Sequence, residues 1–223
     1  MPETAPAAND LLSAAFRDPG LREEALRHRS AGNPHYERLE YLGDAVLNFV
    51  IAEALYTRLP DATEGELTRL RSQLVRGETL AELARQLALG EALELGPGEL
   101  KAGSHRRRSI LADVLEALIG ARLCDAGFET VRGQILSLYA DRLNNLPDAN
   151  SLKDAKTRLQ EWLQADGRAL PAYSVIAEEG PAHSRTFTVR CQVDAEPAVT
   201  ADGRSRRAAE QAAARRMLAQ LQS

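Results

Sequence analysis

The segment ERLEYLGDAV, residues 37–46, has the pattern of a mostly apolar helix and yet carries Glu37, Glu40 and Asp44. At about 100° per residue, the i, i+3, i+7 spacing places these three carboxylates within one narrow arc of a helix. Beyond Asp44 the same face is apolar as far as residue 55, so the acidic stripe should end against packed protein. Like charges at this spacing repel one another, and partial burial raises their cost. The pattern therefore indicates a positive partner, which can be an arginine or a metal ion.

A second apolar helix is expected over SILADVLEALIG, residues 109–120, and it carries Asp113 and Glu116 at i, i+3. Two apolar helices that each present paired carboxylates are suited to form the two halves of one site. Hard cations such as Mg²⁺ prefer oxygen ligands and keep several waters, so a few carboxylates suffice to hold one. The alternative is a solvated acidic face that pairs with Arg38 or Arg58.

Helical periodicity extends over almost all of the first 145 residues. Thr63 and Glu66 have the spacing of a capping box, which places Glu64 in the first turn of a helix. No alternating strand pattern interrupts this part, so we expect an all-α domain. The expected helices lie near 9–29, 35–59, 64–89, 109–125 and 128–145, separated by turn-forming segments.

The pattern changes after NNLPDANSLK, residues 144–153, which has the composition of a linker. A helix over KTRLQEWLQA should be followed by three short strands and an alanine-rich last helix. The second strand alternates apolar and polar residues, and its expected buried face comprises Phe187, Val189, Cys191 and Val193. The order α-β-β-β-α predicts a small α+β domain in which two helices back an antiparallel sheet.

The formal net charge of −4 is unevenly distributed along the chain. Residues 1–150 hold 17 basic and 23 acidic residues, a net of −6, whereas residues 151–223 hold 11 and 9, a net of +2. Such asymmetry fits a division of labour between an acidic site and a part that meets a polyanion.

The N-terminal segment MPETAPAAND has neither the basic start nor the apolar run of a signal peptide. No stretch reaches the length of a membrane helix, so we expect a cytoplasmic protein without a membrane partner. Cys124 and Cys191 lie in apolar patterns and are expected to be reduced core residues.

The segment ERLEYLGDAVL resembles the signature of the ribonuclease III family, usually ERLEFLGDSVL. Three further segments resemble the family's other blocks in the same order: HRSA (28–31), TEGELTRLRSQLV (63–75) and ILADVLEALIGA (110–121). The second part, from KTRLQEW to GRSRRAAEQAAA, resembles a double-stranded RNA-binding domain. The resemblance covers nearly the whole chain and implies a helical nuclease domain over 1–145, a linker over 146–153 and an RNA-binding domain over 154–223.

The resemblance also implies which acids act. Those that match the family's Mg²⁺-coordinating carboxylates are Glu40, Asp44, Asp113 and Glu116, with Asp44 and Glu116 the most directly catalytic and Mn²⁺ a possible substitute. Glu37 and Glu64 match two further acids near the RNA. All six acidic positions are filled, which favours an enzyme over the alternative, a non-catalytic RNA-binding protein on the same scaffold.

Members of the family act as homodimers on double-stranded RNA, and each site cuts one strand. The implied products carry 5′-phosphate and 3′-hydroxyl ends with short 3′ overhangs, and the implied roles are the processing of ribosomal and messenger RNA. No small-molecule cofactor is implied. Tyr41 stands at the family's dimer-contact position in place of the usual phenylalanine.

The expected RNA contacts follow from the shape of the A-form duplex, which exposes 2′-hydroxyls in a wide minor groove and phosphates beside it. Polar residues at i, i+3, i+4 of one helix match the family's first minor-groove contacts, and a loop histidine and two arginines match the others: Thr157, Gln160, Glu161, His183, Arg206 and Arg207. Glu210 departs from the family's frequent lysines in the last helix. The basic triplet Arg106–Arg108 is either a further RNA contact or a solvated loop.

Overall fold

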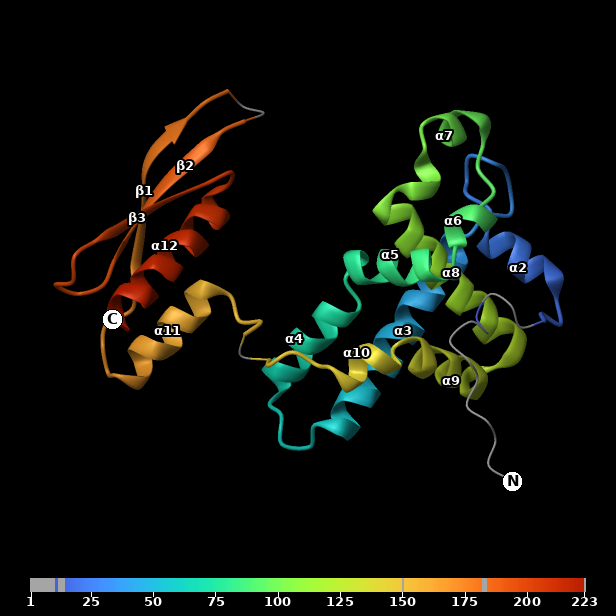
Figure 1. Cartoon of the computed structure of the whole chain (residues 1–223), viewed down its shortest axis with the longest axis horizontal. Coiled ribbons are helices and arrows are strands. Elements are labelled where there is room, and N and C mark those ends of the chain that lie inside the picture. The colour runs from blue at the N-terminus through green and yellow to red at the C-terminus, as the bar shows by residue number, and fades with distance from the viewer. Residues whose placement is uncertain (1–10, 12–14, 150, 182–183, 223) are drawn as a thin grey trace. The chain divides into compact units, whose positions relative to one another are not determined.

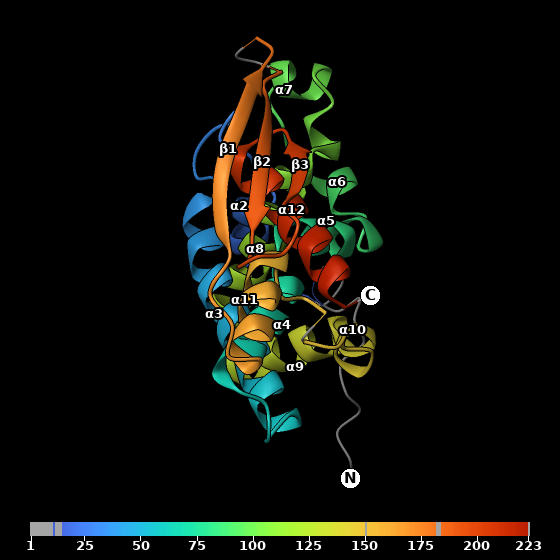
Figure 2. The ribbon, with the colours of Figure 1, turned by 90° about the vertical axis from the view of Figure 1, so that its left-hand side faces the viewer.

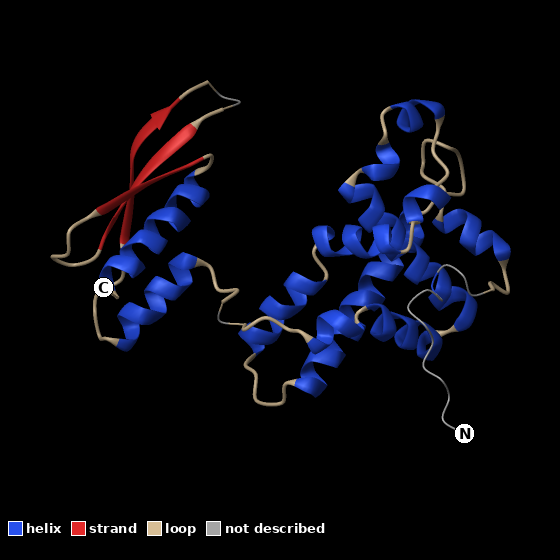
Figure 3. Ribbon diagram, viewed as in Figure 1, coloured by secondary structure: helices blue, strands red, loops and turns tan. Residues whose placement is uncertain are grey.

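The computed structural model of the chain describes residues 11, 15–149, 151–181 and 184–222. It divides into two compact units, residues 1–149 and 150–223. Figure 3 shows helices throughout the described part of the first unit, and strands together with helices in the second. The predicted order, an all-α domain followed by an α-β-β-β-α domain, is confirmed.

The helices of the first unit, labelled in Figure 1, are α2 (Pro19–Ala25), α3 (Glu37–Arg58), α4 (Glu64–Leu74), α5 (Gly77–Gln86), α6 (Leu89–Ala92), α7 (Pro97–Lys101), the 3₁₀ turn η1 (Ser104–Arg106), α8 (Arg108–Ala126), α9 (Phe128–Leu138) and α10 (Ala140–Asn144). The segment expected as one helix over 64–89 is two helices, because the backbone is extended at Arg76. The expected loop between 89 and 108 contains three short helical segments.

Helices α3 and α8 pack against each other in the first unit (Figure 1), and Figure 2 shows α3 along one edge of that unit. On α3 the face beyond Asp44 is fully buried at Leu47, Ile51 and Leu55, so the acidic stripe does end against packed protein. Phe49 is 58% exposed, because it lies on the opposite side of this helix, where its ring contacts that of Phe128 at 5.8 Å between centroids. The predicted capping box is present at the start of α4, where Thr63 accepts from the Glu66 backbone and the Glu66 side chain accepts from Thr63.

The second unit begins with α11 (Ala155–Ala165), continues through β1 (Ala172–Glu179), β2 (Thr186–Gln192) and β3 (Val199–Gly203), and ends with α12 (Arg206–Leu221). The strands pair antiparallel in the order β1-β2-β3, with a bulge in β1 between Val175 and Ala177. Val189, Cys191 and Val193 are fully buried and Phe187 packs at the margin of the same core, which confirms the predicted face.

The two cysteines differ in burial. Cys191 lies in the core of the second unit as predicted, whereas the prediction for Cys124 was wrong, because it is exposed. The last turns of α8 instead bury the ion pair between Arg122 and Asp125, and Cys124 lies outside that face. Among the described residues, no helix combines the length and apolar character needed to span a bilayer.

Candidate metal centre

The crossing of α3 and α8 is unusually close because a glycine lies on each side of it. A Cβ atom built on Gly43 would stand 1.7 Å from the carbonyl oxygen of Glu116, and one on Gly120 would stand 2.1 Å from that of Leu39. Backbone therefore packs directly on backbone here. Neither glycine was singled out from the sequence, although a glycine inside an apolar helix costs about 1 kcal/mol relative to alanine and often has a packing reason.

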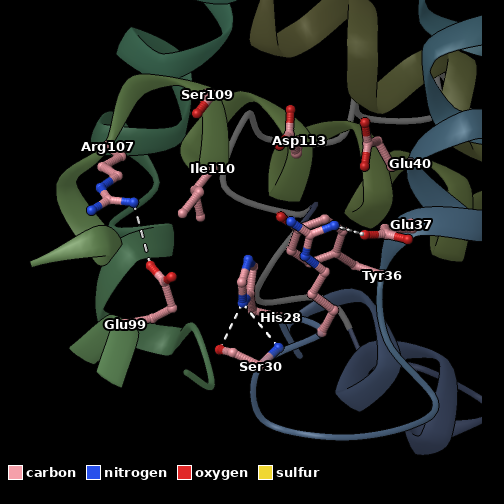
Figure 4. Close-up of a pocket in the computed structure, with 11 residues that line it drawn as sticks. His28, Ser30, Tyr36, Glu37, Glu40, Glu99, Arg107, Ser109, Ile110 and Asp113 are labelled. Atoms are coloured by element: carbon pink, nitrogen blue, oxygen red, sulfur yellow. Dashed lines mark hydrogen bonds and ion pairs between the residues drawn. The ribbon is translucent and has the colours of Figure 1, made fainter. Parts of the chain in front are cut away.

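This crossing brings carboxylates from the two helices together. Glu40 follows Leu39 on α3, and Asp113 and Glu116 lie on the facing turns of α8. One oxygen from each of these three side chains lies within 4.8 Å of the others, and each residue is partly buried. Figure 4 shows Glu40 and Asp113 side by side at one end of a pocket. Three convergent carboxylate oxygens are a suitable donor set for a hard divalent cation.

Burial and mutual repulsion raise the pKa values of these acids. Burial is the main cause for Glu116, whose pKa rises to about 8, and the neighbouring charges of Asp44, Glu40 and Asp113 add to it. Burial followed by Asp113, Glu37 and Asp44 raises the pKa of Glu40 to about 7. Burial also raises the pKa of Asp113. The site therefore holds negative charge at a cost, which a bound cation would relieve.

Arginine does not neutralise this cluster. In the described part of the chain, no ion pair of 4.0 Å or less involves Glu40, Asp44, Asp113 or Glu116. Arg58 instead donates to the backbone of Leu143 and to Asn144. Arg29 pairs with Glu37 at 3.4 Å, outside the cluster. The alternative, a solvated acidic face paired with nearby arginines, is thus not what the structure contains. The carboxylates are instead arranged so that they could bind a metal ion.

The other acids singled out from the sequence lie at different distances from this centre. Asp44 is exposed, accepts from Asn48 Nδ2 at 2.8 Å, and is close enough to raise the pKa of Glu116. Glu37 lines the adjoining pocket. Glu64 is not brought to the cluster within one chain: on α4 it accepts from Thr68 at 2.8 Å and lines an apolar groove beside Tyr56.

The pocket beside the acids has a volume of about 650 Å³ and carries both signs of charge (Figure 4). Arg29 and Arg107 stand at its rim, the latter paired with Glu99 at 3.4 Å. Its polar lining also includes Ser109, in the first turn of α8, and buried His28. Of the triplet Arg106–Arg108, only Arg107 lines this pocket.

Four of the six predicted RNA contacts lie around one hollow of about 640 Å³ between α11 and the start of α12. They are Thr157, Gln160, Arg206 and Arg207. Glu161 lies outside it and pairs with Lys153 at 2.6 Å, and His183 lies outside the described residues. Glu210 reaches into the hollow and binds Lys156 at 2.7 Å and Arg206 at 3.0 Å.

The metal-free protein is expected to lose stability as the pH rises from about 4.5 to 8. Because the pKa values of Glu40 and Glu116 lie near 7 and 8 in the fold, the folded state binds more protons than the unfolded chain in this range. Below about pH 4.5, the pKa of a glutamate in the unfolded chain, the two glutamates contribute their full stabilisation to the fold. This stabilisation decreases as the pH rises and is lost once the pH has passed through 7 and 8. In EDTA, the melting temperature of the natural protein should fall more steeply than that of Glu116→Gln; parallel curves would contradict the shift.

An all-α domain with a carboxylate cluster for a divalent cation, joined to an α-β-β-β-α domain with basic residues on its helices, is the combination of a nuclease for double-stranded RNA. Comparisons with known proteins agree. The family model for ribonuclease-III-like domains matches residues 18–143, and that for the double-stranded RNA binding motif matches residues 155–221.

Relatives match over the full length. Ribonuclease 3 of Alkalilimnicola ehrlichii is 55% identical over 100% of this chain and 98% of its own, and that of Xanthomonas axonopodis is 53% identical over 96% and 95%. The solved nuclease domain of ribonuclease III from Campylobacter jejuni is 37% identical, with a TM-score of 0.59 over 62% of this chain and 97% of that one. The chain belongs to the ribonuclease III family, the metal-dependent endoribonucleases of double-stranded RNA.

Proposed function

We propose that the protein hydrolyses phosphodiester bonds of double-stranded RNA with Mg²⁺ held by Glu40, Asp44, Asp113 and Glu116. The observation that carries this proposal is the convergence of three carboxylates within 4.8 Å, with no cationic side chain paired to them among the described residues. Mn²⁺ offers the same preference for oxygen ligands and is the expected substitute.

The residues of the chain have distinct tasks in this reaction. When bound, Mg²⁺ would supply a nucleophilic water at neutral pH and would offset the charge that develops on the phosphate oxygens. Glu40, Asp44, Asp113 and Glu116 would hold the cation at the α3–α8 crossing, and Asp44 and Glu116 are proposed to act most directly in the cleavage step. Glu37 and Glu64 shape the approach of the RNA. The products are expected to carry 5′-phosphate and 3′-hydroxyl ends with short 3′ overhangs.

Duplex selectivity is assigned to the second unit. Thr157, Gln160 and Glu161 on α11 are proposed to contact one minor groove, and His183, which follows β1 and precedes β2 in the sequence, is proposed to contact the next. Arg206 and Arg207 are proposed to bind the phosphates between them. The proposed domains are the nuclease over 1–145, the linker over 146–153 and the RNA-binding domain over 154–223. The proposed setting is the cytoplasm, with ribosomal and messenger RNA precursors as substrates.

A homodimer is proposed to form through the outer face of α3. That face exposes large aromatic side chains, with Tyr41 at 81%, Phe49 at 58% and Tyr56 at 73%. An apolar groove of about 320 Å³ between α3 and α4 adjoins it. One solved relative is described as flexible in the region involved in forming its dimer.

Tyr41→Asp should convert the dimer to a monomer in sedimentation experiments, because a carboxylate buried without a partner at an apolar interface is costly. Cleavage at low protein concentration should fall with it. Leu100→Asp on α7, also an exposed apolar position at 57%, is the control and should remain dimeric. A dimeric Tyr41→Asp would place the interface elsewhere.

The direct test of the proposed reaction is incubation of a long RNA duplex with the protein in Mg²⁺ and in EDTA. Cutting is expected in Mg²⁺ only, in duplex regions only, and with the ends named above. Binding without any cutting in Mg²⁺ or Mn²⁺ would favour the non-catalytic alternative. Cutting that persists in EDTA would reject the metal centre.

A further inference from the structure

A second hollow lies beside the one that holds the predicted RNA contacts of the second unit. Its volume is about 430 Å³, and the cationic side chains around it are Lys153, Arg158, Arg207 and Arg215. The two hollows share Asp154, Arg207 and Gln211, so Arg207 stands on the ridge between them.

The arrangement follows from the packing of α11 against α12. Arg207, Gln211 and Arg215 have i, i+4, i+8 spacing and form one stripe along α12, which faces the start of α11. Gln211 fixes this stripe: its side chain accepts from the backbone of Ala155 at 2.7 Å and donates to Asp154 Oδ1 at 2.9 Å. The base of the hollow is therefore a fixed hydrogen-bonded network.

Among the described residues, only one of the four cationic side chains around this second hollow is in an ion pair: Lys153 contacts Glu161 at 2.6 Å. Within the described residues, Arg158, Arg207 and Arg215 have no side-chain hydrogen bond or ion pair. The one carboxylate in the hollow, that of Asp154, is occupied by Gln211 and by the Thr157 backbone at 3.0 Å. By contrast, Glu210 already binds two cations of the first hollow.

We propose that the second hollow is a phosphate-binding site for the backbone of duplex RNA, which extends the contact of the second unit beyond the first hollow. This proposal rests on the proposed function. Guanidinium groups match phosphate oxygens with paired donors, and three of them around one hollow suit a polyanion better than a single anion of a small molecule. This proposal makes Arg215 an RNA-binding residue, although no sequence motif points to it.

The test is a salt titration of RNA binding by the full chain in EDTA, where the RNA is not cut. Arg158→Gln with Arg215→Gln removes two charges from exposed positions and leaves a polar side chain at each. Each phosphate contact contributes about 0.9 to the slope of log K against log salt in duplex DNA. The double variant should bind a long RNA duplex about tenfold more weakly at moderate salt, with a slope shallower by about 2.

Arg190→Gln is the matched control, because Arg190 is exposed on β2 between buried Val189 and Cys191 and so points away from the helices. It should keep the natural affinity and slope, and all variants should keep the natural melting temperature. A double variant with the natural affinity and slope would overturn the second site while leaving the proposed function intact. A natural protein that fails to bind duplex RNA would instead overturn the proposed function.

Discussion

Replacing Glu116 with glutamine is expected to reduce Mg²⁺-dependent cleavage of duplex RNA by about a thousandfold. A bound metal contributes several kcal/mol to the stabilisation of the transition state, and each 1.4 kcal/mol is a factor of ten in rate. Glutamine keeps the shape of the side chain but removes the negative oxygen that converges with Glu40 and Asp113. Single-turnover cleavage at saturating protein measures this loss without a contribution from RNA binding.

The fold should survive this change. The close contact at the crossing uses the carbonyl oxygen of Glu116 and not its side chain. Burial raises the pKa of Glu116 to about 8, so a neutral amide also removes a cost that the metal-free protein bears near pH 8. The variant should therefore melt no lower than the natural protein in EDTA, bind duplex RNA normally, and gain less stability from added Mg²⁺.

Glu23→Gln on α2 is the matched control, since Glu23 is an exposed glutamate outside the metal cluster. It should cleave at the natural rate. Natural cleavage by Glu116→Gln would remove that residue from the metal centre, and an unfolded variant would instead show that the carboxylate has a structural role.

The sequence could predict features that depend on local periodicity. The buried continuation of the acidic face of α3 and the buried face of β2 are of this kind, because side-chain direction repeats with the period of the element. The capping box at Thr63 is equally local, because it depends only on the residue types three positions apart. The break at Arg76 was missed, since the apolar spacing continues across it and the extended backbone there leaves no distinct signal.

The geometry of the candidate site depends only in part on residues that are close together in the sequence. That α3 and α8 each carry paired acids is visible in the chain, but which of them converge depends on where two helices cross. Glu40, Asp113 and Glu116 meet there, whereas the carboxylate of Asp44 accepts a hydrogen bond from Asn48 one turn further along. Glu64 lies on another helix beside the exposed aromatic face. Its proposed role near the RNA therefore depends on an arrangement that a single chain does not contain.

Gly43→Ala is expected to be the most destabilising single-methyl change in the first unit. The added Cβ would stand 1.7 Å from the carbonyl oxygen of Glu116 and 2.9 Å from the backbone nitrogen of Gly120. Overpacking of a core typically costs about 1–3 kcal/mol, and here no side chain can rotate away, because both neighbours are backbone atoms. We expect a cost of about 3 kcal/mol or more, which lowers the melting temperature by about 6–12 °C.

The same change should abolish metal-dependent cleavage even where the protein remains folded. Glu40 and Asp44 flank the contact on α3 and Glu116 is its partner on α8, so separation of the helices moves the carboxylates apart. Duplex RNA binding should persist, since the contacts assigned to the second unit are not touched. Stabilisation by added Mg²⁺ should be lost together with cleavage.

Gly65→Ala distinguishes this mechanism from a general sensitivity of helical glycines. Gly65 lies in the first turn of α4, and its added Cβ would meet only the flexible end of Arg69, at 3.2 Å. Alanine is favoured over glycine within a helix by up to about 1 kcal/mol, so this variant should melt at or above the natural temperature and cut normally. If Gly43→Ala behaved like Gly65→Ala, the α3–α8 crossing could open without dispersing the acids, and close backbone packing would not be what assembles the metal centre.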